Sequence, residues 1–261
     1  MSTAPTARSD GGAAPRSRRR GVTATELRLF VRDPGTTFWI LGFPTALLCI
    51  LGAIPSFREP NADQGGQSVV DLYVPVVVLL TVIVASVQSM PATLSTYREQ
   101  GILRRLRATP VSPAALLRAQ VVLHLSAVAV GAATAVAVAR LVLDVPLPQH
   151  LAGWLLALVL AAAAAFALGA LVSAVAPTAR VSQTIGTLVF FPLMFTAGVW
   201  LPVQTMPGLL QDVVLLTPLG AAARGLNDAA TGSWPQLVDL AVTGGWAVVL
   251  TALAVRCFRW E

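Results

Sequence analysis

The sequence predicts an all-α integral membrane protein with six transmembrane helices, and composition carries most of that prediction. The chain has 261 residues, of which 56% are hydrophobic and 11% are charged, whereas a soluble domain usually carries about a quarter charged residues. The deficit is concentrated in long stretches. Residues 151–176 contain no charge and exceed the roughly 20 apolar residues that cross a bilayer. A helix that is apolar on every face over that length has no place on a soluble surface.

Six apolar stretches have a length suited to crossing the bilayer. The predicted spans are residues 37–54, 69–90, 119–141, 151–175, 185–201 and 237–257. Residues 202–235, between the last two spans, are moderately apolar but are interrupted by Pro202, Pro207 and Pro218. Short apolar runs of this kind are more often re-entrant or interfacial than spanning. We therefore predict one or two short helices that dip back from the outer face.

The placement of arginine predicts the orientation of these spans. All eighteen basic residues are arginine. With both termini in the cytoplasm, three of them (Arg58, Arg140 and Arg224) lie outside and the other fifteen lie inside. This asymmetry follows the positive-inside rule. We expect a multi-pass protein of the plasma membrane with cytoplasmic N- and C-termini.

The N-terminal residues 1–21 differ from the rest of the chain. They are rich in Ala, Pro, Ser, Gly and Arg, a composition typical of disorder. Arg16 and Arg18 to Arg20 would be attracted to anionic membrane lipids. We therefore divide the chain into a disordered basic tail, residues 1–21, and a transmembrane domain, residues 22–261.

Two segments on the predicted cytoplasmic side have the pattern of short helices. In residues 23–33, Thr23 and Glu26 have the spacing of a capping box, and the apolar residues that follow share one face. This helix would lie flat in the inner interface and stop near Pro34. In residues 96–108, Thr96 and Glu99 repeat the capping-box spacing, and arginines surround an apolar stripe. On composition this second segment is either a charged loop that fixes the adjoining spans or a docking surface for a partner.

This second segment also carries a resemblance to a known family. Residues Tyr97 to Ser112 read YREQGILRRLRATPVS, which resembles the signature that follows the second span in ABC-2 type transporter permeases. A second similar stretch runs from Phe191 to Pro202 and continues to Leu219, and the closing residues 256–260 also look like the end of such permeases. The chain is most similar to the daunorubicin-resistance-like subgroup, which exports drugs or lipids. Ala197, Thr217 and Gln100 depart from the common residues of that pattern.

The resemblance implies a role for each of several segments and a separate ATPase subunit. Residues 96–108 would be a coupling helix that docks on a separate ABC ATPase subunit, residues 23–33 a connecting helix, and residues 202–218 a re-entrant outer gate. Two permease copies, identical or paralogous, would pair above two ATPase subunits. The expected coupling residues are Arg98, Glu99, Ile102, Leu103, Arg104, Arg105, Leu106 and Arg107.

ATP chemistry is not expected on this chain. A phosphate-binding loop of the GxxxxGK[ST] type needs its lysine, and the chain has none. ATP and magnesium would be bound by the partner, so this subunit is expected to be non-catalytic and to hold no cofactor. No metal site is expected, because His124 and His150 are isolated from other ligands. No nucleic-acid partner is expected either.

The candidate substrate path is less well defined. Polar and aromatic residues of the second and fifth spans could line it for a hydrophobic drug, antibiotic or lipid, or could equally pack between helices or face lipid. These candidates are Gln88, Gln183, Thr187, Phe191 and Phe195. Two other classes stay open. An ion-coupled secondary transporter usually shows a carboxylate near the midplane, and none is evident here; a non-transporting scaffold would share the same helix packing.

Overall fold

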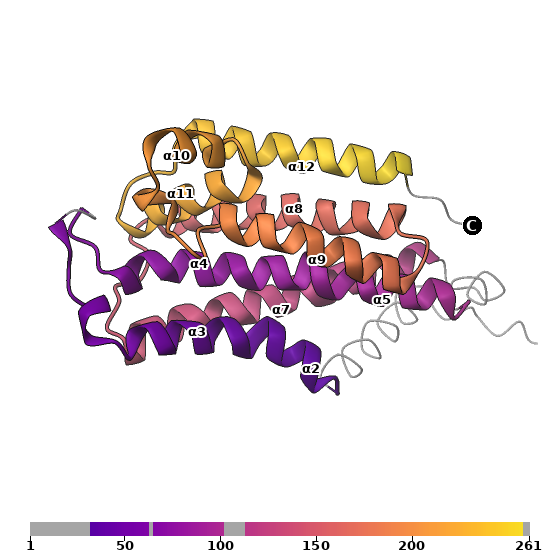
Figure 1. Cartoon of the computed structure of the whole chain (residues 1–261), viewed down its shortest axis with the longest axis horizontal. Coiled ribbons are helices and arrows are strands. Elements are labelled where there is room, and N and C mark those ends of the chain that lie inside the picture. Colours follow the sequence, from indigo (N-terminus) through magenta and orange to yellow (C-terminus); the bar gives the residue numbers. More distant parts are fainter. Residues whose placement is uncertain (1–31, 63–64, 102–112, 258–261) are drawn as a thin grey trace, which may run out of the picture.

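The protein is an elongated bundle of helices that run along its long axis (Figure 1). The computed structural model describes residues 32–62, 65–101 and 113–257, and within them the regular elements are all helices. Five described helices are long and apolar enough to cross a membrane, or six if a bent helix pair is counted as one span. The predicted tail, the first interfacial helix up to Val31 and the coupling residues Ile102 to Arg107 lie outside the described residues.

The first span begins earlier than its hydropathy predicted. It comprises α2 (Pro34–Thr37), the π-helical turn η1 (Phe38–Gly42) and α3 (Phe43–Gly52), against a predicted range of 37–54. Asp33 caps it, because its carboxylate accepts from the Thr36 amide at 3.2 Å and from the Thr36 hydroxyl at 2.6 Å. An acidic N-cap followed by proline is a common helix start.

The second span is the central helix of the bundle. It runs without a break from α4 (Val69–Ile83) through the π-helical segment η4 (Val84–Ser89) into α5 (Met90–Glu99). Its start at Val69 agrees with the prediction, and a capping box between Ser68 and Asp71 fixes it. Its predicted end at residue 90 is wrong, because the helix continues to Glu99. Nearly every side chain of α4 is buried by the surrounding helices.

The predicted capping box at Thr96 and Glu99 is also wrong. Thr96 lies inside α5, where its hydroxyl donates to the Ala92 carbonyl at 2.9 Å. The helix ends rather than begins in this region: Gln100 is its C-cap, and Gly101 adopts a positive φ of 65°. A glycine in that conformation is a common helix terminator. The capping-box pattern could not reveal that a helix was already running through it.

Three further spans complete the bundle. They are α7 (Pro113–Val142), α8 (Leu151–Val175) and α12 (Leu237–Cys257). The last two match the predicted ranges, and α8 packs against both α12 and the π-helical segment η4. The structure describes α7 from Pro113 onward, and the predicted range of 119–141 lies within it.

The fifth apolar stretch forms α9 (Ala179–Thr196), which lies beside α5 and η4. It starts six residues before the predicted range of 185–201. Because its first turns include Arg180 and Gln183, it is not among the five helices apolar enough to be counted as spans by composition. Its 18 residues correspond to about 27 Å, close to the roughly 30 Å of hydrocarbon.

A broken segment follows α9, as the prolines predicted. It contains the short turn η5 (Val203–Thr205), α10 (Gly208–Leu215) and α11 (Pro218–Ala230), and the last two are bent by 102° to each other. Both helices lie at one end of the bundle, whereas the start of α2 and the end of α12 lie nearer the other (Figure 1). We call the end that holds α10 and α11 the hairpin end and the opposite one the junction end.

Candidate functional site

Three helix ends meet at the junction end of the bundle. Arg98, in the last turn of α5, donates from Nη2 to the carbonyl of Ser173 at 2.8 Å and to that of Ala176 at 2.5 Å. Its neighbour Glu99 accepts from the backbone amide of Ala179 at 2.8 Å through Oε1. The first two carbonyls belong to the end of α8 and the amide to the start of α9. Two adjacent side chains of α5 therefore form hydrogen bonds on both sides of the turn at residues 176–178.

The charges of this junction suit the helix ends that they touch. The C-terminus of a helix carries partial negative charge and its N-terminus partial positive charge. Arg98 places a cation on the free carbonyls of α8, and Glu99 places an anion on the first amide of α9. Hydrogen bonds that involve an ionised partner are shorter and stronger than neutral ones. The junction thus satisfies backbone groups that the two helix ends would leave open.

A cavity of about 610 Å³ opens beside this junction, between the start of the first span, the η4–α5 segment and α9. This volume is in the range of pockets that hold drug-sized molecules. Two of the residues predicted for a substrate path, Gln88 and Gln183, line it. Its remaining lining is a mixture of polar and aromatic side chains: Asp33, Thr36, Trp39, Ile40, Val84, Ser89, Ala92, Thr93, Thr96, Tyr97 and Phe190.

One wall of the cavity is backed by a buried polar pair. Ser89, which lines the cavity, lies 3.0 Å from Nε2 of His124, and Nδ1 of that ring lies 2.8 Å from the Gln120 carbonyl. The carbonyl can only accept, so Nδ1 carries the proton and Nε2 accepts from the Ser89 hydroxyl. His124 is 1% exposed. The sequence showed it only as isolated from other metal ligands; the structure shows that it fixes the orientation of a cavity hydroxyl.

The other predicted path residues lie elsewhere. Thr187, Phe191 and Phe195 are exposed on α9 and do not line the cavity. Phe191 stacks on Trp200, with ring centroids 6.4 Å apart and planes within 10°. Their exposure leaves the aromatic face of α9 available to lipid or to another chain. The five candidates are therefore divided between an internal cavity and an external surface.

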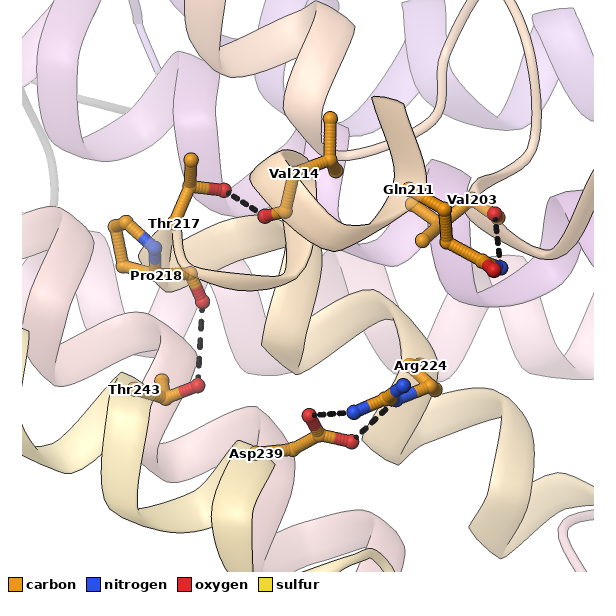
Figure 2. A network of polar contacts seen from close by, with 8 residues as sticks. All are labelled: Val203, Gln211, Val214, Thr217, Pro218, Arg224, Asp239 and Thr243. Carbon is orange, nitrogen blue, oxygen red and sulfur yellow. Dashed lines mark hydrogen bonds and ion pairs between the residues drawn. The ribbon is translucent and has the colours of Figure 1, made fainter. Parts of the chain in front are cut away.

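A separate polar network holds the bent helix pair at the hairpin end (Figure 2). Arg224 of α11 forms a two-point ion pair with Asp239 of α12, at 2.8 Å from Nε to Oδ2 and 2.6 Å from Nη2 to Oδ1. The Thr243 hydroxyl donates to the Pro218 carbonyl at 3.2 Å, and the Gln211 amide donates to the Val203 carbonyl at 2.8 Å. The Asp239 side chain is buried.

Glycines allow two helices to approach the π-helical segment of the central span. A Cβ at Gly169 of α8 would overlap the Ser86 carbonyl, and one at Gly186 of α9 would lie 2.7 Å from the Val87 carbonyl. π-Helical turns inside α-helices occur frequently at functional sites. Val84, Gln88 and Ser89 of this segment line the cavity. The two glycines pack against the backbone of Ser86 and Val87 in the same segment.

Sequence reasoning missed the partners of most of these groups. Nothing in the sequence connects Arg98 to the end of α8, 75 residues later, or Arg224 of α11 to Asp239 of α12. A local signal did exist for Asp33, because Asp followed by Pro marks a helix start. The hydropathy pattern placed the start of the span three residues too late.

Comparison with known proteins supplies the context for these sites. The family model for the ABC-2 type transporter matches residues 20–229. The daunorubicin resistance ABC transporter permease protein DrrB1 of Streptomyces coeruleorubidus is 34% identical over 83 residues, which are 31% of this chain and 29% of the relative. The inner membrane transport permease YhhJ of Escherichia coli is 23% identical over 205 residues, 76% of this chain and 54% of the relative. These matches cover about a third to a half of the relatives' own length.

Proposed function

Because the chain belongs to the ABC-2 type transporter family, we propose that it is the membrane-spanning permease subunit of an ATP-driven exporter whose ATPase is a separate chain. The observation that carries the proposal is the cavity of about 610 Å³ beside the junction end. It has the size of a drug pocket, and it adjoins the segment that continues from Glu99 toward the second predicted cytoplasmic helix. The cargo and the partner's contact site would therefore lie next to each other.

The proposed cargo is a hydrophobic drug, antibiotic or lipid-like molecule that leaves the cytoplasm. Aromatic side chains from three elements, Trp39, Tyr97 and Phe190, line the cavity together with several hydroxyl and amide groups. Such a lining suits a mostly apolar molecule with a few hydrogen-bonding groups. The name of one relative refers to daunorubicin resistance, which makes this drug a practical first probe.

The proposed mechanism couples the ATPase to the helices at the junction end. ATP would close the ATPase dimer, and the docked segment from Arg98 to Arg107 would move with it. The second and third spans join this segment at its two ends, so they would tilt and open the cavity outward. A second permease copy would complete the path, with the exposed aromatic face of α9 as the surface it covers. Both termini would lie in the cytoplasm.

The experiment is reconstitution of the permease and its ATPase in liposomes. ATP-dependent movement of daunorubicin, together with stimulated ATP hydrolysis across a panel of hydrophobic drugs and lipids, is the expected result. Thr93→Trp fills the cavity and should reduce transport about tenfold or more while the complex still assembles. Thr134→Trp is the matched control, because Thr134 is exposed on α7 and does not line the cavity.

Other outcomes would overturn the proposal. Transport that follows a proton or sodium gradient without ATP would identify a secondary transporter. Absence of any transport by the wild-type complex, with the chain needed only for assembly of a membrane complex, would identify a scaffold. A cavity-filling variant that transports as well as the control would remove the cavity from the path.

A further inference from the structure

We propose that Arg98 and Glu99 are positioning residues that transmit movement of the docking segment to α9, the helix that carries one wall of the cavity. The inference rests on the proposed function, since it concerns how an ATPase-driven movement reaches the cargo path. It assigns these two side chains to contacts within the chain, whereas the sequence pattern alone had suggested direct contacts with the ATPase.

Arg98 and Glu99 lie where the end of α5, the end of α8 and the start of α9 meet, and we call this contact the joint. α5 ends at Glu99, and the chain turns at Gly101 into the segment expected to dock on the partner. From that last turn, Arg98 reaches two carbonyls at the end of α8, and Glu99 reaches the first amide of α9. Only residues 176–178 separate α8 from α9. The last turn of α5 is therefore hydrogen-bonded to both sides of the turn at residues 176–178.

The first half of α9 packs along α5 and η4 with small side chains. The buried residues of its first half are Ser182 and Gly186, both small, and Gly186 lies against the Val87 carbonyl of the central helix. Small residues let helices approach closely but interlock weakly with a neighbour. The hydrogen bond from the Ala179 amide to Glu99 is thus a polar attachment of the first turn of α9 to α5.

The connection reaches the cavity within one turn of helix. Gln183 lies four residues after Ala179, on the same helix, and lines the cavity. Opposite it, Thr96 and Tyr97 line the cavity from the turn of α5 that also holds Arg98 and Glu99. A displacement of the joint therefore moves two walls of the cavity together. Without the Glu99 contact, α5 could move while α9 stayed in place.

The charges at the joint explain why a conservative replacement should preserve it. In Glu99→Gln, the new side chain would still offer a carbonyl oxygen to the Ala179 amide, although it would lose the attraction of a carboxylate for a helix N-terminus. Alanine would offer neither. The order of effect, wild type then glutamine then alanine, distinguishes a hydrogen-bonded joint from a requirement for charge at the partner surface.

The test combines two measurements on the full chain in lipid nanodiscs and liposomes with its ATPase. Amide hydrogen exchange reports the joint directly. In Glu99→Ala, the first turn of α9 should exchange roughly tenfold to a hundredfold faster, the range expected for loss of one charge-assisted hydrogen bond. In the same variant, daunorubicin transported per ATP should fall at least fivefold, while ATP hydrolysis and co-purification of the ATPase stay within twofold of wild type. Glu99→Gln should recover most of both signals.

Arg180→Ala is the matched control, since Arg180 is an exposed charge in the first turn of α9, and its side chain forms no hydrogen bond or ion pair with the described residues. It should leave exchange and coupling unchanged. Unchanged exchange in Glu99→Ala would overturn the inference, as would loss of ATPase binding in that variant, which would place Glu99 at the partner surface. If the wild-type complex shows no ATP-driven transport, the proposed function fails, while the exchange measurement still decides whether the joint exists.

Discussion

Arg224 and Asp239 are joined by two hydrogen bonds that tie the bent helix pair to the first turn of the last span. The Asp239 side chain is 1% exposed and that of Arg224 is 25% exposed, so the carboxylate depends on this arginine for its charge compensation. The connection at residues 231–236 turns the chain from α11 into α12 and brings the two residues together, although fifteen positions separate them in the chain. The pair therefore fixes where α11 rests on the bundle.

Breaking this pair from one side should destabilise the protein strongly. Arg224→Ala leaves a buried carboxylate without its partner, a change that typically costs about 3–5 kcal/mol. The double variant Arg224→Met/Asp239→Leu should recover much of that loss, because neither charge is then left alone. Thermal unfolding of wild type, Arg224→Met, Asp239→Leu and the double variant in one detergent closes a double-mutant cycle and measures the coupling. Arg140→Ala, an exposed arginine of α7, is the control, and strictly additive losses would show that the pair is not coupled.

Glycine at position 169 is required for the contact between α8 and the π-helical segment. A Cβ there would overlap the Ser86 backbone carbonyl, which cannot move aside as a flexible side chain would. Gly169→Ala should therefore reduce the yield of folded protein and lower its melting temperature by several degrees. Gly245→Ala is the matched control, since nothing lies near a Cβ at that position of α12. Its melting temperature should stay the same or rise, as alanine favours helix over glycine. Equal behaviour of the two variants would mean that α8 does not pack this closely.

The fold could be predicted from the sequence wherever hydropathy or the position of proline alone determined a helix. The spans at 151–175 and 237–257 agree with α8 and α12, because long apolar stretches with charges only near their ends, or none, leave little choice. The prolines after residue 201 correctly predicted a broken segment, since proline cannot continue a helix interior. The predicted end of the central helix was wrong. Polar residues such as Arg98 and Glu99 indicated a loop or a new helix, whereas in the structure they form hydrogen bonds with the ends of neighbouring helices.

The candidate site was less predictable, because its parts come from separate elements. Gln88 and Gln183 were chosen as polar residues in apolar spans, and the cavity brings them together. Thr187 was chosen for the same reason but does not line the cavity, although it lies one turn after Gln183 on α9. A sequence pattern gives the face of a helix only after its neighbours are known. The coupling residues from Ile102 to Arg107 remain a prediction, as they lie outside the described residues.

Asp33 should make the start of the first span sensitive to strong acid. Hydrogen bonds from the side chain and backbone of Thr36 lower the pKa of Asp33 below its usual value. Its contribution to stability is therefore fully present above the unfolded pKa of about 3.9 and is lost as the pH falls through the lower folded value. Asp33→Ala removes the cap at a cost of about 1 kcal/mol, and Asp33→Asn should cost less. Thermal unfolding between pH 8 and strongly acidic pH checks both: the gap between wild type and Asp33→Ala should be constant down to about pH 5 and narrow below pH 4. A gap that changed between pH 8 and pH 6 would assign the effect to another group.

Cysteine labelling should place the junction end of the bundle in the cytoplasm. Arg98, Arg180 and Arg256 lie at that end, whereas Arg58 and Arg224 belong to the hairpin end and are engaged there with the Gly52 carbonyl and with Asp239. Positive charge is retained on the cytoplasmic side. In a background without the two native cysteines, a membrane-impermeant maleimide should label Ser56→Cys in intact cells. It should label Gln100→Cys only after the membrane is permeabilised. Both positions are exposed, so a difference in labelling reports the side of the membrane rather than burial. The reverse pattern would invert the topology and move the cavity and the joint at Glu99 away from any cytoplasmic ATPase.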